Sequence, residues 1–180
     1  MVKAKLRQTL KMRAAQVVDR DVKTDQLHQQ LILFLHNYPG CWGTYSSIPG
    51  EISLNSLSSL CPAIQFAYPK VVGSELEFWI PGDKGFAPEA RWGILEPIAD
   101  GARQVSLAEM SGYLVPGLGF DKRGVRLGWG KGFYDRALSG FSGLKVGIAF
   151  AELVQTDLPC EDHDVRMDFL VTELGTLKVV

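Results

Sequence analysis

The sequence predicts an α/β protein with three layers, in which helices cover both faces of a mostly parallel sheet. Short apolar runs alternate with segments of helical spacing, which is typical of βα units. The chain has 180 residues and no break in composition, so we expect a single domain over 1–180. A glycine-rich stretch follows one apolar run and precedes a helical one, where such sheets usually bind ligands.

The composition is that of an ordinary globular protein, with 46% apolar residues, 22% charged residues and a net charge of −1. This charge argues against bulk affinity for nucleic acid or membrane. No apolar run approaches the roughly 20 residues of a membrane span, and the basic N-terminus lacks the apolar stretch of a signal peptide. Cys41, Cys61 and Cys160 match no zinc spacing and no disulfide framework, which favours thiols in a reducing cytoplasm.

Residues 3–18 are predicted to form an amphipathic helix. Its apolar stripe consists of Leu6, Leu10, Ala14 and Val17. Lys3, Arg7 and Lys11 recur every four residues and share another face. From spacing alone, a solvated basic face is the favoured interpretation of these three cations.

A second helix is predicted from an N-cap at Thr24 to Asn37. Its core face would consist of Leu27, Leu31, Phe34 and Leu35. His28 and His36 fall on or near the other side and have no partner in sequence that suggests catalysis or a metal, so both are interpreted as surface residues.

The next segments read as strand 41–45, turn 46–51, helix 52–60 and strand 64–68, which Pro69 would end. Glu51 lies at the turn into the predicted helix. It could complement the helix dipole, or it could accept hydrogen bonds from a ligand at the mouth of the sheet. Spacing alone does not choose between these roles.

Further strands are predicted at 76–79, 112–115, 145–150 and from Asp168 onward, with a long loop at 80–92. The carboxyl ends of parallel strands meet at one edge, so the loops after positions 45, 68, 115 and 150 should gather there. His163 stands between two aspartates, but adjacent side chains do not face each other, which argues against a catalytic pair.

The stretch 114–135 reads LVPGLGFDKRGVRLGWGKGFYD. Pro116 cannot continue a central strand, so the chain should leave the sheet there, form a long loop and enter a helix near Phe133. Glycine N–H groups and a helix start favour an anion, and Arg126 and Lys131 would add positive charge. Asp135 suits a helix start or a metal. The alternative is a glycine loop with solvated charges, because neither a Walker A motif nor a dinucleotide fingerprint is present.

This stretch closely resembles the signature of 5-formyltetrahydrofolate cyclo-ligases, also called 5,10-methenyltetrahydrofolate synthetases. Weaker support comes from KAKLR, IPGEI, FAYPKV, GILEP and DHDVRMD elsewhere in the chain. The resemblance implies a fold like that of sugar-phosphate isomerases and CoA transferases. It also implies conversion of 5-formyltetrahydrofolate to 5,10-methenyltetrahydrofolate, with ATP cleaved to ADP and phosphate and Mg2+ required.

The resemblance also implies roles for individual residues. Lys3 and Arg7 would contact the ATP phosphates, which reverses the interpretation drawn from spacing alone. The remaining ATP-binding residues would be Arg126, Gly128, Gly130, Lys131, Gly132 and Tyr134. Arg126 and Lys131 would be catalytic, and Asp135 and Asp168 would hold Mg2+. Glu51, Trp129 and Phe133 would bind the folate, which could be polyglutamylated.

Two positions depart from the family pattern. Trp129 stands where relatives often carry Tyr or a basic residue, and Phe133 where Tyr is usual. Neither change removes a phosphate-binding or metal-binding group, so retained activity in a monomer is expected. The alternatives are a non-catalytic folate- or nucleotide-binding protein on the same scaffold, and ATP chemistry on a different acyl acceptor.

Overall fold

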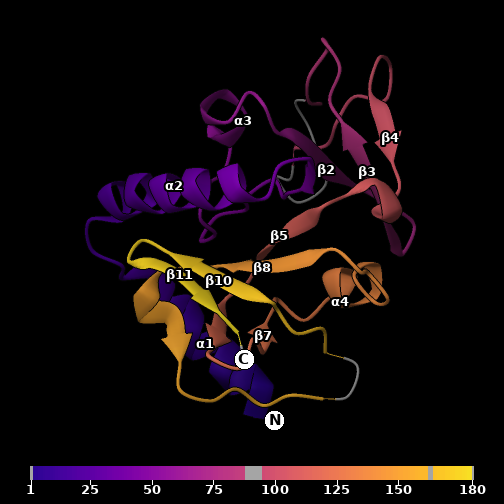
Figure 1. Cartoon of the computed structure of the whole chain (residues 1–180). Coiled ribbons are helices and arrows are strands. Elements are labelled where there is room, and N and C mark those ends of the chain that lie inside the picture. Colours follow the sequence, from indigo (N-terminus) through magenta and orange to yellow (C-terminus); the bar gives the residue numbers. More distant parts are fainter. Residues whose placement is uncertain (1, 88–94, 162–163, 180) are drawn as a thin grey trace.

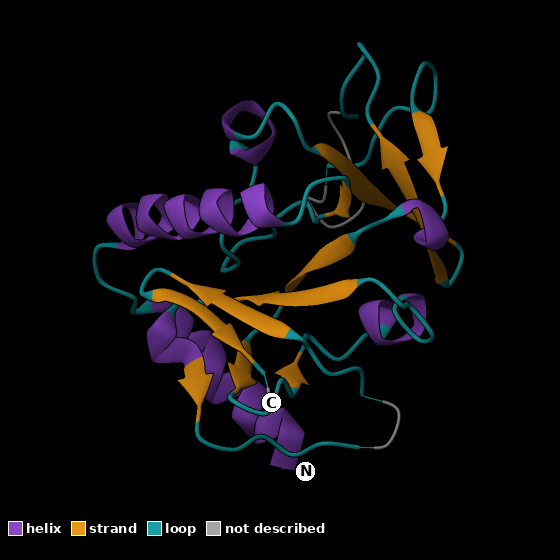
Figure 2. Ribbon diagram, in the orientation of Figure 1, coloured by secondary structure: helices purple, strands orange, loops and turns teal. Residues whose placement is uncertain are grey.

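The computed structural model, which describes residues 2–87, 95–161 and 164–179, has a large sheet between two layers of helices (Figures 1 and 2). The helices are α1 (Val2–Ala15), α2 (Arg20–Asn37), α3 (Leu57–Leu60) and α4 (Phe133–Ala137). The large sheet contains, in spatial order, β11 (Gly175–Lys178), β10 (Phe169–Thr172), β8 (Leu144–Ile148), β5 (Gly112–Pro116), β1 (Cys41–Gly43), β2 (Gln65–Val72), β3 (Glu75–Ile80) and β4 (Arg103–Val105). A small sheet contains β7 (Arg126–Leu127), β6 (Gly119–Asp121) and β9 (Val154–Gln155).

The predicted α/β architecture with a mostly parallel sheet is confirmed. Strands β10, β8, β5, β1 and β2 are parallel, whereas β11, β3 and β4 join antiparallel at the two sides. In Figure 1, α2 lies above β8 and β10, and α1 and α4 lie below them. None of the described helices has both the length and the apolar character that crossing a membrane requires.

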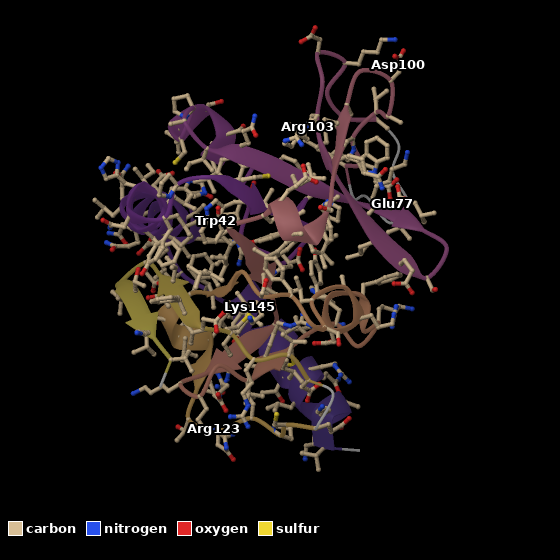
Figure 3. All side chains as sticks on the ribbon, turned by 45° about the vertical axis from the view of Figure 1, so that its right-hand side comes forward. Trp42, Glu77, Asp100, Arg103, Arg123 and Lys145 are labelled. Carbon is tan, nitrogen blue, oxygen red and sulfur yellow. The ribbon has the colours of Figure 1, made fainter. Side chains whose placement is uncertain are left out.

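The interior is formed by large apolar side chains from strands and helices. Trp42 is fully buried, and its indole N–H donates to the Tyr38 carbonyl at 2.8 Å. Figure 3 shows Trp42 inside the molecule, whereas Asp100, Arg103 and Arg123 point outward at the periphery. The predicted stripe of α1 is buried at Leu10 and Ala14, as expected for an amphipathic helix.

Helix α2 begins at Arg20, earlier than the N-cap predicted at Thr24. Asp19, with a φ of 53°, precedes the helix, and the Thr24 hydroxyl donates to the Arg20 carbonyl inside it. The predicted core face is confirmed, and His36 is exposed as predicted. The surface interpretation of His28 is wrong. Its ring is 6% exposed, and Nε2 lies 2.8 Å from the carbonyl of Ser53.

Two predicted boundaries in the next segment also differ. The helix expected at 52–60 is only α3, and β2 continues through Pro69, which pairs with Phe78 of β3. Strand β1 pairs with β2 only as far as Ala67. Pro69, which lacks an N–H group, therefore does not interrupt the hydrogen bonds between β1 and β2. The short strands β4 and β11 were not predicted, because their pairing depends on neighbours that are distant or joined by a tight turn.

The loop predicted after Val115 is largely a hairpin. Pro116 is the last residue of β5 and pairs with Ile148, and then β6 and β7 form an antiparallel pair. Its turn encloses the fully buried carboxylate of Asp121, which accepts hydrogen bonds from the backbone N–H groups of Arg123 and Val125. Positions 88–92 of the predicted loop 80–92, and His163, lie outside the described residues.

Candidate active-site cleft

A cleft of about 420 Å³ opens at the carboxyl edge of the parallel strands. Helix α1 contributes Lys3, Arg7 and Lys11 to its wall. The segments after β1 and β5, the paired strands β2 and β3, and the glycine-rich stretch supply most of the rest. These further residues are Ser46, Ile48, Glu51, Pro69, Val71, Leu76, Pro116, Arg126, Leu127, Gly128, Trp129, Gly130, Lys131, Gly132, Phe133, Tyr134, Asp135 and Asp164. The prediction that loops after positions 45, 68 and 115 share one edge agrees with this lining, whereas the loop after 150 is not part of it.

Glu51 is held by a tight turn rather than by a helix. The Glu51 N–H donates to the Ile48 carbonyl at 2.9 Å, and Gly50 between them has a φ of 97°. Proline followed by glycine at positive φ is the sequence pattern of a type II turn. The Glu51 carboxylate accepts a hydrogen bond from the Ile48 N–H at 3.1 Å, and Arg20 donates to the Glu51 carbonyl. The role as a first-turn helix residue is therefore wrong.

The Glu51 carboxylate is a hydrogen-bond acceptor on the cleft wall. Burial raises its pKa, while hydrogen bonds from the Ile48 N–H and the Trp129 indole and the charge of Arg126 act in the opposite direction. The Trp129 contact is 2.8 Å long and joins the turn to the glycine-rich stretch. A carboxylate in this position can accept further hydrogen bonds from a ligand with paired N–H donors.

Arg126 supplies a buried positive charge to the cleft. Its guanidinium donates to the Pro116 carbonyl at 3.2 Å and to the Asp135 carboxylate at 2.8 Å. The same group lies 5.5 Å from the centre of the Tyr134 ring. Arg126 pairs with Phe120 of β6 at the start of β7, and the glycine-rich segment follows directly after Leu127.

The glycines bring α1 close to this segment. Arg7 Nε donates to the Gly128 carbonyl at 2.9 Å. Gly130 has a φ of 94°, and a Cβ there would lie 3.2 Å from the Arg7 guanidinium carbon. Any larger residue would therefore be strained and would crowd Arg7. Lys3 lies at the rim and pairs with Asp164 at 2.8 Å and Glu161 at 3.0 Å.

The helix that follows the glycine-rich stretch is too short to contribute much to the predicted anion site. α4 has five residues, so its dipole adds little charge, and the cations supply most of the positive field. The Tyr134 ring packs on Tyr113, with centroids 5.7 Å apart, and burial raises the pKa of its hydroxyl. Tyr134 thus lines the cleft and also belongs to the core. Phe133 lies in the cleft wall, with the Arg136 guanidinium 5.2 Å from its ring centre.

The two predicted metal ligands are not brought together. Asp135 lines the cleft, but Asp168 does not. Asp168 precedes β10 at the amino edge of the sheet, where its carboxylate accepts a hydrogen bond from the Lys145 N–H at 2.7 Å and pairs with the Lys145 ammonium. This geometry therefore does not support the predicted pair. Asp168 was predicted at a strand start, and in a parallel sheet strand starts lie at the edge opposite the carboxyl ends, so its metal role rested on the resemblance alone.

Mg2+ commonly binds through one or two carboxylates while keeping waters and phosphate oxygens. Asp135 fits one such contact, because its carboxylate lies at the cleft beside the phosphate-binding candidates. Within residues 2–87, 95–161 and 164–179, no group of three or more His, Cys, Asp or Glu side chains forms a protein-only metal cage. The donor set suits an ion carried by a phosphate ligand.

Three polar residues of the cleft wall had no site role assigned from the sequence. Lys11 lies with its ammonium 4.5 Å from the centre of the Trp129 ring. Ser46 donates to the Leu95 carbonyl at 2.5 Å, and Asp164 pairs with Lys3. The spacing of Lys11 behind Lys3 and Arg7 was a usable signal, whereas the positions of the other two depend on tertiary contacts.

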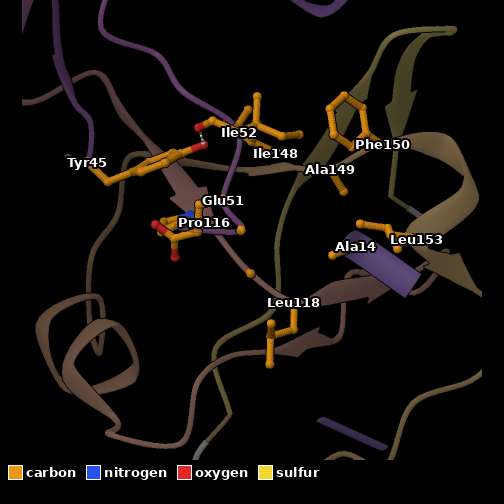
Figure 4. A pocket seen from close by; sticks show the side chains of 12 residues that line it. Ala14, Tyr45, Glu51, Ile52, Pro116, Leu118, Ile148, Ala149, Phe150 and Leu153 are labelled. Carbon is orange, nitrogen blue, oxygen red and sulfur yellow. Dashed lines mark hydrogen bonds between the residues drawn. The ribbon is translucent and has the colours of Figure 1, made fainter. Parts of the chain in front are cut away.

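A second, much smaller recess lies beside the cleft and shares Glu51 and Pro116 with it (Figure 4). Its volume is about 10 Å³, and Tyr45, Leu118 and Phe150 are among its mostly apolar walls. That space is no larger than one water molecule needs. It is a packing gap at the edge of the core and is too small for a nucleotide or a folate.

The fold and cleft define an α/β protein with a cleft lined by cationic residues and glycines at the carboxyl edge of its sheet. The family model for the "5-formyltetrahydrofolate cyclo-ligase family" matches residues 48–173. The chain therefore belongs to that family.

Individual relatives agree with this assignment. A 5-formyltetrahydrofolate cyclo-ligase from Mus musculus is 33% identical over 94 residues, which cover 48% of this chain and 46% of the mouse protein. The chain thus spans about half the length of several curated relatives that it matches. A cyclo-ligase from Mycoplasma pneumoniae is 26% identical over 172 residues, covering 91% of this chain and 92% of that protein.

Solved structures resemble the chain over almost its whole length. The NMR structure of Aquifex aeolicus 5,10-methenyltetrahydrofolate synthetase matches with a TM-score of 0.84 and 30% identity, covering 99% of this chain and 93% of that one. The M. pneumoniae synthetase structure matches with a TM-score of 0.77 at 23% identity, covering 96% and 99%, and shows the shared fold.

Proposed function

We propose that this chain is an ATP- and Mg2+-dependent 5-formyltetrahydrofolate cyclo-ligase that forms 5,10-methenyltetrahydrofolate, ADP and phosphate. The observation that carries the proposal is the combination, in one cleft of a family member, of the cations Lys3, Arg7, Arg126 and Lys131 with the partly buried carboxylate of Glu51. Cations suit a triphosphate, and a carboxylate suits the N–H donors of a pterin ring. We further propose a cytoplasmic, single-domain monomer.

The reaction requires the protein to align the two substrates and to neutralise phosphate charge. The formyl oxygen attacks the γ-phosphorus of ATP, ADP leaves, and the formyl carbon becomes bonded to a phosphate leaving group. The folate N10 then attacks that carbon and loses its proton, and the C–O bond breaks with release of phosphate. Such a reaction depends on holding two substrates in line and stabilising phosphate charge.

The residues divide between the two substrates. Lys3, Arg7 and the 128–132 backbone would hold the triphosphate, with Arg126 fixed beneath it by Pro116 and Asp135. Lys131 would stabilise the transferred phosphoryl group. Glu51, Trp129 and Phe133 would hold the folate. Mg2+, when bound at Asp135, would neutralise phosphate charge.

The experiment that tests the proposal is a spectrophotometric assay of the purified chain with 5-formyltetrahydrofolate, ATP and Mg2+, omitting each component in turn. Methenyltetrahydrofolate should form only in the complete mixture. Binding of both substrates in calorimetry without product would favour the non-catalytic alternative. ADP formation with another acyl compound and none with 5-formyltetrahydrofolate would favour a different acceptor.

Asp135→Asn is expected to raise the Mg2+ concentration for half-maximal activity by about tenfold or more, because a neutral amide is a weaker ligand for a hard cation. Asp168→Asn is the matched comparison, since Asp168 lies outside the cleft and contacts Lys145. Activity measured against Mg2+ concentration for both variants gives the two half-maximal concentrations to compare. An altered titration for Asp168→Asn alone would favour the ligand role first predicted for Asp168.

Glu51→Gln is expected to raise the folate concentration for half-saturation by about tenfold and leave the ATP requirement nearly unchanged. The loss of a charged hydrogen bond typically costs about 1.5–3 kcal/mol. Steady-state titrations of each substrate, with the other saturating, measure both effects. A larger change for ATP than for folate would contradict the proposed folate role.

A further inference from the structure

The Trp129 side chain is fixed by contacts on several sides. Its indole N–H donates to Glu51 Oε1 at 2.8 Å, and the Lys11 ammonium lies 4.5 Å from its ring centre. A Cβ on Gly50 would lie 3.9 Å from the ring, so the ring packs over the turn that carries Glu51. Three segments distant in sequence therefore meet at this indole.

The chemistry of these groups determines which protonation state of Glu51 the contact favours. An indole N–H only donates, and its bond to an ionised carboxylate is stronger than its bond to the carbonyl oxygen of a protonated carboxylic acid, so the contact favours the ionised form. The Ile48 N–H donates to Oε2, and the Trp129 N–H donates to Oε1. A carboxylate has about four acceptor positions, so capacity remains on both oxygens for a ligand.

We propose that Trp129 is a positioning residue, whose indole N–H favours the ionised form of Glu51 and fixes its carboxylate as an acceptor on the cleft wall. Where the ligand is concerned, the inference deepens the proposed function and rests on it. The contact itself exists in the ligand-free chain and can be tested without folate.

Several other charged or titratable groups lie around Glu51. Arg126 and Arg20 bring positive charge from β7 and α2, and the phenol groups of Tyr45, Tyr113 and Tyr134 lie close enough to interact electrostatically with the carboxylate. Burial raises the pKa of Glu51, and the Trp129 and Ile48 hydrogen bonds oppose that rise. Removing the indole N–H should therefore raise the pKa further, because it removes a bond made to the charged form.

The experiment is an NMR titration of the Glu51 carboxyl carbon in ligand-free protein, comparing the wild type with Trp129→Phe. Phenylalanine keeps an aromatic ring and removes the donor, so the Glu51 midpoint should move upward by about one pH unit. Trp79→Phe is the matched control. Its indole donates to Glu77 at 3.1 Å with the Lys70 ammonium 5.6 Å from the ring centre, and this trio is absent from the cleft wall. The control should leave the Glu51 midpoint unchanged.

The functional readout is the affinity for 5-formyltetrahydrofolate, measured by calorimetry across the same pH range. Trp129→Phe should bind about tenfold more weakly than the wild type at pH values below both midpoints, only about twofold more weakly at the shifted midpoint, and should approach wild-type affinity at higher pH, where Glu51 is ionised in both. A loss that is equal at every pH would mean that Trp129 contributes only packing, and would overturn the inference.

The outcomes separate this inference from the proposed function. A shifted Glu51 midpoint without binding of 5-formyltetrahydrofolate to either protein would support the positioning role and refute the folate role. An unshifted midpoint with intact folate binding would refute the positioning role alone. If Trp129→Phe does not fold, the wild type still decides, because the Trp129 indole resonance must titrate with the same midpoint as Glu51.

Discussion

Lys131→Ala is expected to lower the turnover number of the cyclo-ligase reaction by about 10²–10³-fold, as is usual when one preorganised charge donor is removed from a reacting centre. The side chain is exposed and lines the cleft between Gly130 and Gly132. Its loss leaves no cavity in the core. The free energy of unfolding should therefore change by no more than about 0.5 kcal/mol.

Lys122→Ala is the control for this variant. Lys122 is an exposed lysine in the same glycine-rich stretch, in the turn between β6 and β7, and it is not part of the cleft wall. Both variants remove one positive charge, so a general electrostatic effect would appear in both. Turnover measured by methenyltetrahydrofolate absorbance and urea unfolding should separate them. A Lys131→Ala protein that unfolds would show that this segment is structural.

The parts of the fold that the sequence predicted correctly are those with strong local patterns. The four-residue spacing of α1 and the apolar runs of β1, β5 and β8 follow from burial of one helix face or of both faces of a central strand. The glycine-rich stretch was recognisable for the same reason, since glycines between a buried strand and a helix are visible in any sequence, and residues 126–135 of it line the cleft.

The parts that failed depend on partners elsewhere in the chain. Proline is compatible with β2 only because β1 stops pairing at Ala67, which no local pattern reveals. The buried ring of His28 has its partner in the Ser53 carbonyl, 25 residues further along the chain. Two-residue strands such as β7 are too short to show a period.

The candidate site likewise has features that the sequence predicts and features that depend on tertiary contacts. The resemblance named Lys3, Arg7, Glu51 and Arg126, and the structure brings all four to one cleft. The partners of these residues could not be predicted. The contact of Arg126 with Asp135 and that of Glu51 with Trp129 each join two different elements of the fold. Asp168 has the right residue type at the wrong edge of the sheet, which motif matching alone does not detect.

Asp121→Asn is expected to lower the free energy of unfolding at pH 7 by about 3 kcal/mol, because it puts an amide where buried donors require a carboxylate. The Asp121 side chain is fully buried and accepts N–H bonds from Arg123, Val125 and Leu158, at 2.9, 3.0 and 3.0 Å. An asparagine would keep one acceptor oxygen and place an NH2 group against donors. The hairpin that positions Arg126 should loosen with it.

The pH dependence identifies the cause. Burial by itself would raise the pKa of Asp121, but the hydrogen bonds from Arg123, Leu158 and Val125 outweigh burial and lower it. Stability from a lowered carboxyl pKa is present above the unfolded value of about 3.9 and is lost as pH falls through the folded value. Urea unfolding should thus show a difference between wild type and Asp121→Asn that is large at pH 7 and shrinks below about pH 4. Asp157→Asn, which removes only the exposed partner of Arg123, should change stability little at either pH. A pH-independent loss in Asp121→Asn would point to altered packing rather than to the buried charge.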